Sequence, residues 1–175
     1  MPEARPCRKV AVVMRRERID GPMARWQPWR WVLDSVLDDA QALFGTSPRL
    51  LLKDAREERW LHPGFTVALF RDDAEGYFLN ATTAAPCWFV LWRMQEPQAG
   101  GADPIAVPCM VSLSYHDAGR WLDAQETVEQ VPAPDAVVQW MREFADQHMV
   151  VEPKRRKRPE SFRTLTDRFG NPASV

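Results

Sequence analysis

Short apolar runs alternate with turn-forming residues between Trp60 and Met94, and this pattern constrains the fold more than any other feature of the chain. Runs of this length, bounded by Gly, Pro and Asp, are typical of strands. Consecutive strands with tight connections pair antiparallel, because parallel pairing needs a crossover of about a dozen residues or more. We therefore expect an antiparallel meander built from the runs Trp60–His62, Phe65–Arg71, Gly76–Ala81 and Cys87–Met94.

Further strand patterns lie on both sides of this region, at Lys9–Ile19, Arg25–Leu37 and Ile105–Leu113. In the second of them, Trp29, Trp31 and Leu33 share one face at a period of two. Pro28 cannot donate to a strand ladder, so this strand begins near Trp29 or lies at an edge of the sheet. The segment Asp38–Leu52 fits either a short helix ended by a glycine or a loop.

The last third of the chain has helical patterns. Ser114 can cap the amide of Asp117 in a Ser-x-x-Asp capping box, which predicts a helix from Ser114. Asp135 is positioned to cap a second helix. That second helix is amphipathic, because apolar residues recur at helical spacing at Val137, Trp140, Met141, Phe144 and His148.

The fold class we expect is α+β: an antiparallel sheet of about six or seven strands with C-terminal amphipathic helices packed on it. A small barrel capped by a helix is the close alternative. We divide the chain into a flexible N-terminus at residues 1–8, a single α+β domain at 9–151 and a basic, mostly disordered tail at 152–175. The apolar residues, 45% of the chain, are enough to bury a core in a domain of this size.

Composition excludes several classes of protein. Three cysteines without a close pair argue against a disulfide framework. A formal net charge of -1 gives no global attraction to nucleic acid or to anionic lipid. The sequence contains no signal-peptide pattern and no run of about 18 apolar residues, so we expect no membrane association and a cytoplasmic location.

No catalytic or cofactor motif is recognisable, and we expect no cofactor and no catalytic residue. Structural zinc sites use closely spaced ligand pairs, which the dispersed residues Cys87, Cys109, His62 and His116 do not form, so we also expect no metal. Adjacent acidic pairs such as Glu57-Glu58 point to opposite faces of an extended chain and are poor acid–base partners.

Aromatic and basic residues provide the candidate binding site. Eight tryptophans is a high number for this length, and most of them are expected in the core. Trp26 and Trp29, beside a turn and a proline, are the better candidates for exposed residues that contact a partner. The basic run Lys154, Arg155, Arg156, Lys157 and Arg158 is the other predicted partner contact.

The chain resembles an uncharacterised bacterial family that is known only as a domain of unknown function. The resemblance rests on VAVVMRRERIDGP, WQPWRWVLDSVL, GYFLNATTAAPCWFVLWRM and QVPAPDAVVQWMREFADQHM followed by EPKRRKRP, and it covers about Val10 to Arg158. Genes of that family commonly lie beside those for molybdenum-dependent formate dehydrogenase and its maturation factors. The resemblance implies an accessory or assembly role around that enzyme and carries over no catalytic residue.

Three functional hypotheses follow. The first is a non-catalytic protein-binding module, an accessory to formate dehydrogenase or its maturation factors. The second is a nucleic-acid-binding module that uses the basic run with Trp26 or Trp29. The third is an enzyme or small-ligand carrier with a pocket between sheet and helix.

Overall fold

The structure is a computed structural model that describes residues 4–97 and 100–149. The strands are β1 (Cys7–Arg18), β2 (Trp29–Asp38), β3 (Arg49–Lys53), β4 (Glu57–Ala68), β5 (Cys87–Gln95), β6 (Ile105–Ser112) and β7 (Thr127–Pro132). The helices are α1 (Ala74–Ala81), α2 (Tyr115–Asp123) and α3 (Asp135–His148), with two short 3-10 turns, η1 (Pro22–Arg25) and η2 (Arg71–Asp73). No helix within these residues has the length and apolar character needed to cross a membrane.

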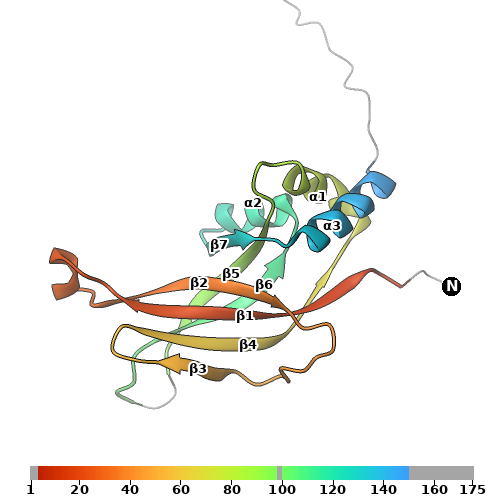
Figure 1. Cartoon of the computed structure of the whole chain (residues 1–175). Helices are drawn as coiled ribbons and strands as arrows, with labels where there is room; N and C mark the ends of the chain where they lie inside the picture. Colours follow the sequence, from red (N-terminus) through yellow and green to blue (C-terminus); the bar gives the residue numbers. More distant parts are fainter. Residues whose placement is uncertain (1–3, 98–99, 150–175) are drawn as a thin grey trace, which may run out of the picture.

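The strands form two antiparallel sheets and no closed barrel. One sheet has four strands in the order β2-β1-β4-β3, and the other has three in the order β6-β5-β7. The three helices gather at one end of the two sheets (Figure 1). This architecture confirms the predicted α+β class and excludes the barrel alternative.

Side-chain alternation on the long strands divides the core into layers. Val12 and Met14 of β1 face the second sheet and pack with Val90 and Ala106 of β5 and β6. Ala11 lies on the opposite face of β1. This alternation follows from the period of two along a strand, so a slip of one residue would expose the buried set.

A second cluster fills the space beneath α1 and α3. Trp88 of β5, Tyr77 of α1 and Met141 of α3 meet there, and each is at most 2% exposed. On the far side of the three-stranded sheet, α2 covers Phe89 with Ala118. Each helix therefore covers apolar surface that the strands leave exposed.

The prediction that the runs between Trp60 and Met94 pair with one another as an antiparallel meander is wrong. The run that includes Gly76–Ala81 is the helix α1, not a strand, and β4 and β5 belong to different sheets. Pro63 and Gly64 do not end a strand either, because β4 continues through them to Ala68. Gly64 has φ +90, in the left-handed region open to glycine, and lies near a register shift in the β1–β4 pairing.

The C-terminal third agrees more closely with expectation. The Ser114 side chain accepts a hydrogen bond from the backbone N–H of Asp117 at 3.3 Å, which confirms the predicted cap of α2. Pro134, not Asp135, is the N-cap of α3 and provides no side-chain cap. Two strands were not predicted from the sequence: β7, before α3, and β3, which covers the end of the segment 38–52 and Lys53.

Candidate functional site

The β1–β2 hairpin ends in a projecting tip that carries Trp26. The two strands pair as far as Arg18 and Trp29, and the connection between them lies beyond the body of the sheet, at the left of Figure 1. Trp26 is 84% exposed and Met23 is 63% exposed. The tip therefore presents two large apolar side chains to solvent.

Backbone hydrogen bonds close the turn at this tip. The N–H groups of Trp26 and Gln27 both donate to the carbonyl of Met23, at 3.0 and 2.9 Å. At the base of the tip, the N–H of Ile19 donates to the carbonyl of Pro28 at 2.8 Å. Trp26 is thus displayed on a closed, hydrogen-bonded turn, which reduces the ordering entropy lost on binding.

Trp29, the other predicted aromatic contact, lies in a different environment. Its ring is half-buried, and the guanidinium of Arg16 lies 4.5 Å from the ring centroid. Arg16 also forms ion pairs with Glu58 at 3.1 Å and Asp103 at 3.3 Å. The structure therefore separates the two tryptophans: Trp26 is exposed at the tip, whereas Trp29 packs beneath a paired arginine.

The rest of the predicted site lies outside the described residues. This holds for Lys154, Arg155, Arg156, Lys157 and Arg158 and for the whole predicted tail, 152–175. Their role in binding stays a prediction.

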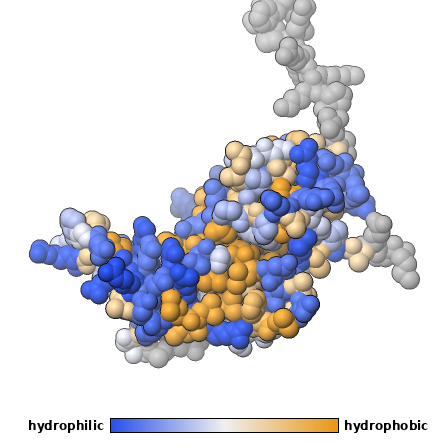
Figure 2. All heavy atoms as spheres, viewed as in Figure 1, coloured by the Kyte–Doolittle hydropathy of each residue, from blue (hydrophilic) through white to orange (hydrophobic). Residues whose placement is uncertain are grey.

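An exposed apolar surface on and beside β3 was not predicted. We name it the β3 edge surface, and it consists of Leu43, Leu50, Leu51 and Leu52, which are between 38% and 76% exposed. Figure 2 shows apolar atoms gathered along the lower side of the molecule, where β3 and the loop before it lie. The run of three leucines was the available signal, but such a run is equally typical of a buried strand.

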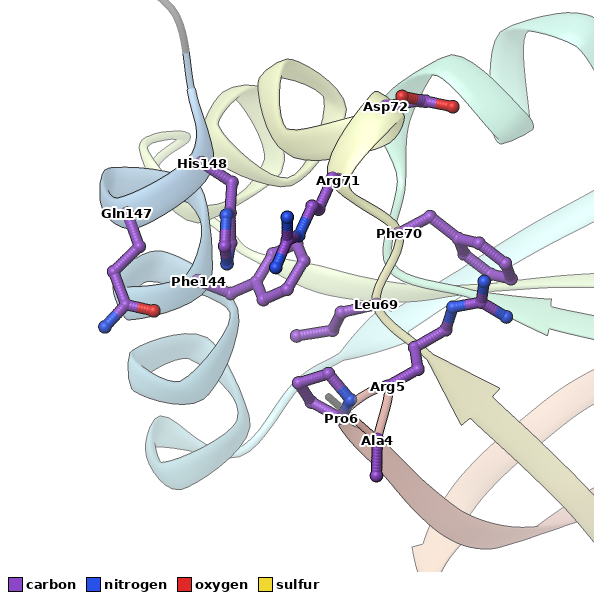
Figure 3. A pocket seen from close by; sticks show the side chains of 10 residues that line it. All are labelled: Ala4, Arg5, Pro6, Leu69, Phe70, Arg71, Asp72, Phe144, Gln147 and His148. Atoms are coloured by element: carbon purple, nitrogen blue, oxygen red, sulfur yellow. The ribbon is translucent and has the colours of Figure 1, made fainter. Parts of the chain in front are cut away.

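A pocket of about 730 Å³ lies between the N-terminal segment, the end of β4 and the last turn of α3 (Figure 3). Leu69 and Phe144 give it an apolar floor, while Arg5, Arg71 and His148 contribute cationic or ionisable groups. Such a lining suits an anionic group on an apolar body.

Part of this pocket is taken up by contacts among its own residues. The guanidinium of Arg5 lies 4.2 Å from the centroid of the Phe70 ring, and the rings of Phe144 and His148 are 4.4 Å apart. In Figure 3 the side chain of Asp72 points away from the cavity. The pocket is thus a weaker basis for a functional proposal than the exposed apolar surfaces.

The dispersed cysteine and histidine residues do not come together as a metal site. Among residues 4–97 and 100–149, no three side chains of His, Cys, Asp or Glu are placed to hold a metal ion. Cys87 is buried, and burial raises the pKa of its thiol, which disfavours a reactive thiolate. Cys109 is exposed, on β6.

His62 gives a pH-dependent stability that can be measured. Burial on β4 lowers the pKa of His62 below its ordinary value of 6.5, so the folded protein takes up this proton only at a lower pH than the unfolded chain. Between these two pKa values the unfolded state binds more protons, and stability therefore falls as the pH drops below about 6.5. We expect urea unfolding at a series of pH values to show this loss.

His62→Gln should flatten the pH dependence of stability below pH 6.5, whatever its effect at neutral pH. Thr66→Ser, at an exposed position on the same strand, is the control: it removes no titratable group and should keep the wild-type slope. An unchanged slope in His62→Gln would assign the acid sensitivity to other groups.

Comparisons with curated proteins and with solved structures found no match to this chain. Residues 9–158 match the family described as "Protein of unknown function (DUF3305)". The match covers β1 from Lys9 onward, and it covers the other described strands and helices completely. This chain therefore belongs to the DUF3305 family.

Proposed function

We propose that this protein is a non-catalytic protein-binding module in which the hairpin tip makes the central contact. The single observation that carries the proposal is Trp26, 84% exposed on a hydrogen-bonded tip. Tryptophan is enriched among the residues that dominate binding energy at protein interfaces. A ring of this size buries about 150–250 Å² when a partner covers it, which is a large gain for a single side chain.

The finer proposal is a cytoplasmic accessory role toward formate dehydrogenase or one of its maturation factors. Its support is the resemblance of the sequence to a family whose genes commonly lie beside those for that enzyme. The projecting shape of the tip supports protein binding in general, because a hairpin can enter a concave surface of a partner.

The test is co-purification with a defined partner. We expect the tagged protein, expressed together with formate dehydrogenase and its maturation factors from the same genome, to retain one of them in a stoichiometric complex. Trp26→Ala should weaken this complex by at least about 2 kcal/mol, or about 30-fold in Kd, the loss typical of a hot-spot residue. Titration calorimetry with the purified components measures the change.

Leu122→Ala is the matched control, since Leu122 is also a large exposed apolar side chain (58%) but lies on α2. It should bind like the wild type. Wild-type affinity in Trp26→Ala would contradict the assignment of the tip. Loss of the captured material on nuclease treatment would favour the nucleic-acid hypothesis instead.

A further inference from the structure

β3 is the outer strand of the four-stranded sheet. The strand order places β4 on one side of it, and no described strand pairs with its other side. All five residues from Arg49 to Lys53 are exposed. An edge strand of this kind offers unpaired backbone N–H and C=O groups to another extended chain.

A register shift between Leu50 and Leu52 places the two cations of β3 on opposite faces of the sheet. From the register with β4, Arg49 and Leu52 share the face of Leu61, while Leu50 and Lys53 share the face of Trp60. Each face of the edge therefore carries one leucine and one cation. A strand added here would find an apolar and a cationic neighbour on each of its own faces.

The cations of β3 differ from most others on the same sheet. Arg8, Arg15, Arg16, Arg30 and Arg59 all form ion pairs with nearby carboxylates. Arg49 instead lies 5.8 Å from the centroid of the Phe44 ring. Within the described part of the chain, neither Arg49 nor Lys53 has a carboxylate at ion-pair distance: Glu58, opposite Lys53 in the register, is paired with Arg16. Both cations of β3 can therefore accept a carboxylate from a partner.

A second copy of this chain is a poor occupant of the edge. Antiparallel pairing of two β3 strands centred on Leu51 places Arg49 of each copy opposite Lys53 of the other. Parallel pairing in register places identical cations side by side. Like charges directly opposite one another destabilise a strand pair, so both arrangements are disfavoured.

We propose that β3 receives an extended segment of a partner protein as an additional strand, and that this segment is apolar in its centre and acidic at both ends. Its backbone would pair with the free edge, its apolar side chains would cover the three leucines, and its carboxylates would face Arg49 and Lys53. The inference adds a second contact, with a stated chemistry, to the proposed protein-binding function.

The probe is a short capped peptide of two valines flanked by a glutamate on each side, because four residues of β4 pair with β3 across its register shift and the end residues of such a segment lie on opposite faces, as Arg49 and Lys53 do. We expect it to bind the full-length protein and to shift backbone amide resonances of Arg49–Lys53 in ¹H–¹⁵N spectra. A peptide with lysines in place of the glutamates should bind about tenfold more weakly, and the difference should shrink at high salt. N-methylation of the peptide amides that face β3 should abolish binding, because it removes the donors of the strand ladder.

The matched protein variant combines Arg49→Glu with Lys53→Glu, with thermal unfolding used to check that it is folded. It should reverse the preference, binding the lysine-flanked peptide better than the glutamate-flanked one. Trp26→Ala should bind both peptides like the wild type. The proposal for the hairpin tip and the proposal for β3 can therefore be tested independently. Equal binding of the two peptides, no binding of either, or insensitivity to N-methylation would each overturn the proposal. Concentration-dependent dimerisation that Leu51→Lys abolishes would do the same, since it would make a second copy the occupant.

Discussion

Trp88→Ala is expected to lower the free energy of unfolding by about 3–5 kcal/mol, the usual cost of removing a large aromatic side chain from a core. Trp88 is 2% exposed and lies in the cluster where β5 meets α1 and α3. Its loss would leave a cavity lined by side chains from both helices, including Tyr77 and Met141. Chemical denaturation followed by far-UV circular dichroism measures the change.

Trp26→Ala is the matched control, because it is the same substitution at an 84% exposed position. It should change stability by less than about 0.5 kcal/mol. The loss of stability in Trp88→Phe should lie between the losses of these two variants. The indole N–H of Trp88 has no hydrogen-bond partner among the described residues, so the phenylalanine variant loses packing but no hydrogen bond. Similar losses for Trp88→Ala and Trp26→Ala would contradict the separation of core and tip.

The burial of Trp88 could be predicted from the sequence, because the period of two along a strand is a local property. Cys87 and Phe89 point toward α2, whereas Trp88 and Val90 point into the core between the layers. The same local logic correctly predicted the Ser114 cap of α2. Patterns of this kind need only neighbouring residues.

The identity of α1 could not be predicted in this way. The run Gly76–Ala81 is too short for periodicity to separate a helix from a strand. The helix packs against a distant segment: Gly76 lies against the start of α2, where an added Cβ would clash with the Ser114 Oγ. The division into two sheets pairs strands that are far apart in the sequence, such as β1 with β4 and β5 with β7, so the pairing could not be predicted from local patterns.

In the candidate site, too, features set by neighbouring residues could be predicted and features set by distant contacts could not. The exposure of Trp26 followed from the adjacent turn and proline, which are local signals. Trp29 carries similar local signals, yet it is half-buried, because Arg16 from the neighbouring strand covers its ring. Trp29 is covered by a residue from a neighbouring strand, whereas the leucines of β3 have no such cover. They are exposed because no described strand pairs with the outer edge of β3.

Asn80→Leu is expected to destabilise the fold by about 3–5 kcal/mol, although it replaces a polar side chain by an apolar one of similar size. Asn80 is 1% exposed and joins α1 to two other segments. Its amide nitrogen donates to the carbonyls of Cys87 and Leu113, both at 2.8 Å, and its amide oxygen accepts from the N–H of Cys87 at 3.1 Å. The substitution would remove the partners of three buried backbone groups at once, each at a cost of about 1–3 kcal/mol.

Gln139→Leu tests whether the loss comes from burial rather than from removing an amide. Gln139 is exposed on α3, and its side chain donates to Glu143 at 3.0 Å. Because water can replace that bond, the variant should stay within about 0.5 kcal/mol of the wild type. In Asn80→Leu the amide proton of Cys87 should also exchange faster relative to the remainder of β5, since it loses a local partner as well as global stability. Wild-type stability in Asn80→Leu would mean that packing alone holds α1 against the start of β5.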